Sequence, residues 1–120
     1  MKERELKQVL DLSIRATKEL DTPLLKECEF SETQIGNVQF CARIVGSQVI
    51  VDSSVRCGGL LFKIGVGKAS LVSEAVATCI MHMQGQKGQH SLQSIQAMID
   101  EEKEKALEFS MFCETLGHDN

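Results

Sequence analysis

The sequence lacks the features that mark several large functional classes. It has no apolar run near the roughly 20 residues that a membrane-spanning helix requires. Its lysines and arginines are scattered, so they form no basic face of the kind that binds nucleic acid. No apolar segment follows Met1–Lys7, and we therefore expect no secretory signal. These absences predict a protein with neither membrane nor nucleic-acid partners.

Closely spaced cysteine pairs are also missing. The five cysteines are an odd number and lie far apart in the sequence. In a chain with no expected signal, this favours free thiols in a reducing compartment over a disulfide framework. We therefore expect a cytoplasmic protein. The cysteines are Cys28, Cys41, Cys57, Cys79 and Cys113.

The composition is that of an ordinary globular domain. The chain has 120 residues, 42% hydrophobic and 25% charged, with a net charge of -4. A chain of this length buries about two thirds of its unfolded surface, which is enough for one core. We predict a single domain over residues 1–120. The glycines and lysine of Gly65–Ser70 fail the spacing of a phosphate-binding P-loop, and no histidine belongs to a local catalytic motif. No enzyme activity is predicted.

The first part of the chain predicts a helix followed by a short strand. Apolar residues recur at helical spacing from Lys2 to Leu20. Asp21-Thr22-Pro23 should end this helix, because the residue before a proline avoids the α conformation. The segment from Leu25 to Phe30 is predicted to be extended. The residues expected to face inward from the helix are Leu6, Val9, Leu10, Ser13, Ile14 and Thr17.

A β-hairpin is predicted from Val38 to Cys57. Apolar and polar residues alternate on both sides of Gly46-Ser47, a pair that suits a two-residue hairpin turn. This turn pairs Val45 with Gln48 and fixes the register of the whole hairpin. One face is then apolar and the other mostly polar, as in an antiparallel sheet with one solvated face. The predicted apolar-face pairs are Ile44 with Val49, Ala42 with Val51, Phe40 with Ser53 and Val38 with Val55; the opposite face pairs Gln39 with Ser54, Cys41 with Asp52 and Arg43 with Ile50.

The rest of the chain predicts a further strand and three helices. Gly58-Gly59 interrupts the hairpin, and a strand spans 60–66. A helix follows over 68–84, then a polar loop. Ser91 is a good N-cap for a helical segment containing Leu92, Ile95, Met98 and Ile99. A charged run, 100–105, leads into a last helix ended by Gly117. The fold class is α+β, with a small antiparallel sheet of about three strands packed against helices.

Several short segments follow one another in a distinctive order. They are Gly36-Asn37-Val38, Val49-Ile50-Val51-Asp52, Ser70-Leu71-Val72-Ser73-Glu74 and Ser91-Leu92-Gln93-Ser94-Ile95-Gln96-Ala97-Met98. Their order and spacing resemble the NifU/IscU-like scaffold family of iron–sulfur cluster assembly. The likeness extends from about Leu25 to the C-terminus and leaves the helix 2–20 as a divergent addition. It implies an IscU-like fold and protein partners of iron–sulfur assembly.

The sequence departs from this family at the positions that hold its metal. The family binds a cluster or zinc with three cysteines and an aspartate. Ile35 stands at the first cysteine position and Asn37 at the aspartate. The second cysteine falls at Leu60 or Val66, depending on the gap, and the third at Phe109. Apolar side chains offer no sulfur, nitrogen or oxygen donor to iron or zinc. The stretch that the family offers to its chaperone is also missing, with Glu104-Lys105-Ala106-Leu107 in its place. We therefore expect no bound cofactor.

A relocated metal site is the alternative. The hairpin register places Cys57 opposite Gly36, beside the first ligand position, and Cys113 lies one helical turn after Phe109. With Cys41 or Asp52 they would hold an iron–sulfur cluster or zinc. The opposing interpretation is that Cys57 and Cys113 pack in the core, as free cysteines commonly do. Two thiols without a third ligand make a poor metal site, so we favour packing.

The leading hypothesis is a divergent scaffold-like protein that holds no cluster and acts through protein–protein contact. Its motivation is the family-like order of segments combined with apolar residues at all three cysteine positions. The alternatives are a metal-binding scaffold with relocated ligands and an unrelated α+β adaptor or enzyme domain. The sequence does not identify the residues that contact a partner.

Overall fold

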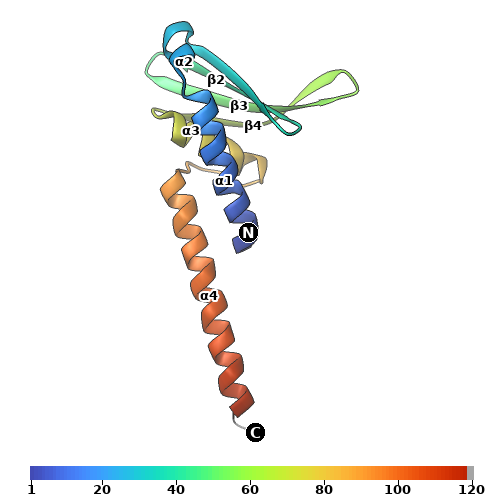
Figure 1. Ribbon diagram of the computed structural model, residues 1–120, viewed down its shortest axis with the longest axis vertical. Coiled ribbons are helices and arrows are strands. Elements are labelled where there is room, and N and C mark those ends of the chain that lie inside the picture. The colour runs from blue at the N-terminus through green and yellow to red at the C-terminus, as the bar shows by residue number, and fades with distance from the viewer. Residues whose placement is uncertain (119–120) are drawn as a thin grey trace.

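The computed structural model describes residues 1–118, with side chains through Leu116, as a sheet of four strands with four helices (Figure 1). All neighbouring strands are antiparallel and follow the order β1-β2-β3-β4. This confirms the predicted α+β class, with one strand more than the sequence suggested. The elements are α1 (Glu3–Leu20), α2 (Pro23–Cys28), β1 (Phe30–Ile35), β2 (Val38–Val45), β3 (Gln48–Cys57), β4 (Leu60–Ala69), α3 (Val72–Met83) and α4 (Leu92–His118).

The first helix forms where the sequence predicted it, but its buried face is rotated slightly. Ala16 and Leu20 are fully buried, whereas Ile14, expected inside, is about half exposed. α1 is tied to the sheet through Ser31 on β1, whose hydroxyl donates a 2.7 Å hydrogen bond to the Leu20 carbonyl. Ser13 is buried as expected because its hydroxyl bonds to the carbonyl one turn earlier.

The segment after α1 is helical rather than extended. Pro23 ends α1, as predicted, but it also starts the short helix α2. Proline suits the first turn of a helix because its missing N–H has no partner there in any case. The predicted strand 25–30 is therefore wrong. The first strand, β1, begins at Phe30 and joins β2 through a turn at Gly36, whose φ of 60° favours glycine.

The β2–β3 hairpin has the register that the sequence predicted. All eight predicted pairs are present, from Val45–Gln48 at the turn to Val38–Val55. Phe40, Ala42 and Val51 on the inner face are fully buried, while the other face is mostly half-buried or exposed. The pairing with β2 stops at Val55. Cys57 therefore lies two residues beyond the last β2–β3 pair, and on the other side of β3 it pairs with Leu60 on β4.

Strand β4 continues past the position where a helix was predicted to begin. It runs through Ala69, and α3 starts only at Val72. Its pairing with β3 shifts register between Ser53 and Ser54. The reason for the late start of α3 is the close contact between α3 and the inner face of β4. A Cβ atom on Gly67 would lie 2.5 Å from the Cys79 backbone nitrogen, so glycine is required for this approach.

The core lies between the inner face of the sheet and the helices α1 and α3. Its fully buried members come from every layer, including Phe40 from β2, Ile80 from α3 and Ile95 from α4. No buried side-chain nitrogen or oxygen lacks a hydrogen-bond partner within the described residues. Leu71, which lies within the predicted helix 68–84, is more than half exposed because it precedes α3 rather than lying within it.

The last helix, α4, is continuous and projects away from the rest of the protein (Figure 1). Two helices were predicted here, separated by the charged run 100–105. The run remains helical, and Lys105 forms an ion pair with Glu101 one turn earlier at 3.4 Å. Ser91 caps the helix as predicted, because its hydroxyl accepts the backbone N–H of Ser94 at 3.1 Å. The predicted end at Gly117 is wrong, since the helix extends to His118.

Candidate functional site

The positions that correspond to the family's metal ligands do not form one cluster. Ile35 and Asn37 lie at the β1–β2 turn, and Leu60 starts β4 at the same end of the sheet. Val66 is in the middle of β4, opposite Asp52. Phe109 is exposed in the second half of α4, and this helix projects away from the sheet (Figure 1). The structure therefore does not bring the three positions together.

The two cysteines considered as relocated ligands are also separated. Cys57 is exposed at the end of β3, and Cys113 is exposed on the projecting part of α4 (Figure 1). Neither is packed in the core, contrary to the interpretation that we favoured from the sequence. Among residues 1–118 no three His, Cys, Asp or Glu side chains lie close enough to hold a metal ion.

Cys41 lies on the outer face of the sheet, where the sequence placed it. It is paired with Asp52, whose carboxylate is 3.8 Å from Arg43 and 3.9 Å from Lys63. Partial burial raises the pKa of the Cys41 thiol, and the carboxylates of Asp52 and Glu32 raise it further, while Arg43 opposes them. The thiol is therefore protonated at neutral pH and is a poor nucleophile.

We expect the substitution Asp52→Asn to make Cys41 react a few-fold faster with iodoacetamide at pH 8. Removing the carboxylate removes one cause of the raised pKa and leaves Arg43 to favour the thiolate, so the thiolate fraction increases. Peptide mass spectrometry measures the rate, and the exposed Cys28 in the same chain is the internal control. An unchanged Cys41 rate would mean that Asp52 does not act on this thiol.

The pair Cys79 and His82 on α3 has a structural role. Cys79 is fully buried; burial raises the pKa of its thiol to about 11, and its Sγ lies 3.4 Å from the Ser53 hydroxyl. His82 instead accepts the backbone N–H of Val66 through Nδ1 at 3.1 Å and covers part of the β4 edge. The two side chains serve separate contacts and do not form a ligand pair.

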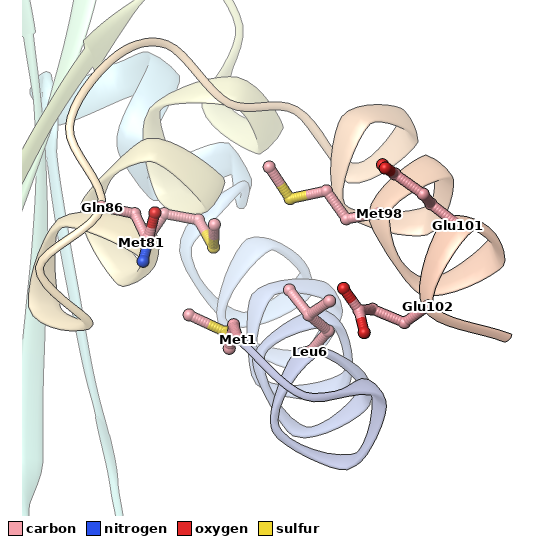
Figure 2. A pocket seen from close by; sticks show the side chains of 7 residues that line it. All are labelled: Met1, Leu6, Met81, Gln86, Met98, Glu101 and Glu102. Carbon is pink, nitrogen blue, oxygen red and sulfur yellow. The ribbon is translucent and has the colours of Figure 1, made fainter. Parts of the chain in front are cut away.

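A cavity of about 170 Å³ lies between α1, α3 and α4. Figure 2 shows three methionine side chains around this space, with two glutamates of α4 at its rim. Its lining contains no cysteine, histidine or basic residue, and therefore offers neither a nucleophile nor a charge partner for the glutamates. The lining residues are Met1, Leu6, Met81, Gln86, Met98, Glu101 and Glu102.

The most unusual surface of the protein is the α4 tail, defined here as residues 103–118. Five large apolar side chains of this segment are between 53% and 69% exposed. Monomeric proteins rarely expose contiguous apolar surface of this kind, and larger patches commonly mark interaction sites. The sequence pattern predicted the helix but gave no sign that its apolar residues would be uncovered. The five residues are Leu107, Phe109, Met111, Phe112 and Leu116.

From Ala106 onward, one side of the α4 tail is continuous in its apolar character; Lys105, at the start of the tail, falls on the same side. At 100° per residue, Ala106, Phe109, Phe112, Cys113 and Leu116 fall within one stripe, hereafter the tail stripe. Leu107 and Met111 lie outside it on the helix circumference. Charged Glu108 and Glu114 are also outside the stripe. Most of the large apolar side chains of the tail therefore lie on the stripe, and all of them are more than half exposed.

A second, smaller apolar patch is at the end of the β3–β4 hairpin. Leu60, Leu61 and Phe62 are each about half exposed or more, and the pairing of β4 with β3 extends beyond the last pair between β2 and β3. Arg56 and Lys63 flank this patch. Charged side chains beside an exposed edge strand are a usual protection against aggregation, so this patch is the weaker candidate.

None of the helices described for residues 1–118 is long and apolar enough to cross a membrane. Comparison of the chain with protein-family models, with curated proteins and with solved structures finds no match.

Proposed function

We propose that the protein acts by protein–protein contact and that the tail stripe of α4 is its contact surface. The observation that carries this proposal is the exposure of large apolar side chains on a helix that leaves the body of the protein. Phe109 and Phe112 are at least 60% exposed, whereas Ile95 and Ile99 on the same helix are buried against the body. A helical apolar stripe that lacks an intramolecular partner is a common docking surface for another helix or groove.

The apolar burial energy available at this surface is modest. Complete burial of an exposed Leu, Met or Phe contributes roughly 1.5–3 kcal/mol, and these side chains are about 60% exposed. Burial of the two phenylalanines and Leu116 would therefore contribute roughly 3–5 kcal/mol before the cost of association. Affinity would be moderate unless the contact extends beyond the stripe.

The resemblance to NifU/IscU-like scaffolds supports a partner from iron–sulfur cluster assembly. In this proposal the chain no longer holds a cluster, since Ile35 and Phe109 replace two of the cysteine ligands. Phe109 would then have changed from a metal-binding position to a contact residue. This part of the proposal rests on the order of sequence segments alone.

We expect a photoreactive phenylalanine analogue at position 112 to form one discrete covalent adduct on irradiation in cells. The side chain at this position lies in the tail stripe and would face a bound partner. The same analogue at position 107, which is equally exposed but lies outside the stripe, is the control and should give little adduct.

Denaturing gel electrophoresis and mass spectrometry identify the adduct. An adduct that depends on position 112 supports the proposed contact surface, whatever the mass of the captured chain. No adduct at position 112, or equal adducts at both positions, would contradict it.

A further inference from the structure

The tail stripe continues a helix–helix seam that already exists inside the protein. Ile95, Ile99 and Glu102 lie on α4 at alternating spacings of four and three residues, and this spacing is typical of a coiled-coil seam. α1 runs antiparallel to α4 and covers this part of it (Figure 1). The same alternation continues into the tail through Ala106, Phe109, Cys113 and Leu116.

The N-terminal end of α1, the helix that covers the seam, lies where the exposed part of the seam begins. Met1, just before α1, lines a cavity together with Glu101 and Glu102 of α4 (Figure 2). Ile99 is 1% exposed, whereas Phe109 is 69% exposed. The seam therefore has a helical partner up to about Glu102 and none in the described chain beyond it.

We propose that a second copy of this chain supplies the missing helix, so that two α4 tails pair antiparallel about a two-fold axis. This inference rests on the proposed function and names the partner. A second copy presents the same apolar stripe, and a two-fold axis places identical surfaces against each other. No further sequence is needed to complete the seam.

The direction of pairing follows from the position of α1. In a parallel pair, the partner's α4 would run alongside this α4 from its start, and its first half would occupy the space that α1 fills. In an antiparallel pair, the C-terminal end of the partner's tail lies next to the N-terminal end of α1. The partner's tail then covers the seam from that point onward. Only the antiparallel arrangement is compatible with the α1–α4 contact.

The register is limited by the contact between α1 and α4 and by the packing of large against small residues. With Phe109 beside the partner's Cys113 and Ala106 beside the partner's Leu116, the end of the partner helix reaches about residue 104, just past α1. A shift of one heptad toward the body would drive it into α1. A shift in the opposite direction would leave Phe109 uncovered. The favoured register also places a large residue opposite a small one in each layer, which suits knobs-into-holes packing.

The size of this interface predicts a weak dimer. The tail has 16 residues, or roughly 24 Å of helix at 1.5 Å per residue. Two such segments form an interface at or below the roughly 1,000 Å² expected of a specific complex. We therefore expect a monomer–dimer equilibrium in the micromolar range, with no preformed covalent link.

We expect Phe109→Glu to raise the dimer dissociation constant by at least about 100-fold, because each copy would bury an unpaired charge in the seam. Met111→Glu is the matched control; Met111 is similarly exposed on the same helix but lies outside the seam, so this variant should remain dimeric. Analytical ultracentrifugation over a dilution series measures the association. Far-UV circular dichroism checks that both variants remain folded.

Disulfide formation tests the direction and register. In a background with Cys28, Cys41 and Cys57 replaced by serine, Cys79 is buried and Cys113 is the one exposed thiol; it should not cross-link under mild oxidation. In the antiparallel register its partner thiol is displaced by four residues, roughly 6 Å along the axis, in addition to the separation of the helices. Adding Phe109→Cys should give a disulfide-linked dimer at high protein concentration, because residues 109 and 113 of different copies then face each other.

The outcomes separate this inference from the proposed function. Efficient cross-linking through Cys113 alone would indicate a parallel pair and overturn the inference, as would a monomer at all concentrations. If the protein is monomeric but the photoreactive analogue at position 112 captures a chain of another mass, the contact surface stands and the second copy does not. A monomer with no adduct would overturn both proposals.

Discussion

Replacing Gly67 with alanine is expected to destabilise the protein by about 3 kcal/mol, because the new methyl group has no space. A Cβ atom there would approach the Ala75 carbonyl and lie 2.5 Å from the Cys79 nitrogen. Both are backbone atoms of α3, so no side-chain rotation can relieve the contact. The helix would have to move away from the sheet and would weaken the packing of Val76 and Ile80, both fully buried.

Urea unfolding followed by far-UV circular dichroism measures this effect, since the chain contains no tryptophan or tyrosine for intrinsic fluorescence. Gly58→Ala is the control. Gly58 has a φ of 58°, but a methyl group added there would meet no atom within 4 Å, so its cost is limited to backbone strain of about 1 kcal/mol. Similar losses at both positions would show that α3 does not rest on β4 at Gly67.

The sequence predicted the β2–β3 hairpin in full because two independent local signals agree there. Gly46-Ser47 sets the turn, and the alternation on either side sets the buried face; a slip of one residue would have exposed Phe40 and Val51. The first strand was missed because its burial is one-sided and shallow. Ser31 is the only fully or nearly fully buried residue of β1, and it is polar.

The boundary between β4 and α3 was misplaced for a different reason. Glycine carries no hydrophobic signal, so the predicted strand stopped at residue 66, before Gly67, and the helix was placed from residue 68. The inward positions of Gly65 and Gly67 are filled by the α3 backbone instead of by their own side chains. Such a contact depends on residues far along the chain, and local periodicity does not contain it.

The candidate site was predicted only in part. The sequence indicated an amphipathic helix at the C-terminal end, and that helix is present. Helical periodicity identifies an apolar face but does not specify whether the same chain or another molecule covers it. That distinction depends on the position of the N-terminal end of α1, which lies near Glu102 of α4. Only the tertiary arrangement shows this position. The tail residues Phe109 and Leu116 were therefore not recognised as a contact surface.

Replacing Phe40 with alanine is expected to cost about 3–5 kcal/mol. Phe40 is the largest fully buried side chain and lies on the inner face between Thr33 of β1 and Ser53 of β3. Its two lateral neighbours are small and polar, so they cannot expand to fill the cavity. The loss is a large part of the roughly 5–15 kcal/mol that separates folded and unfolded states of a typical domain.

The matched control is the same substitution at Phe62. This phenylalanine is about half exposed on the β3–β4 hairpin, so its removal should cost about 1 kcal/mol or less. Urea midpoints from circular dichroism again provide the comparison. Equal costs at the two positions would mean that the inner face of the sheet is not the centre of the core. A large loss at Phe40 alone would show that packing between the sheet and the helices α1 and α3 stabilises the fold. The α4 tail lies outside this packing and is available for association.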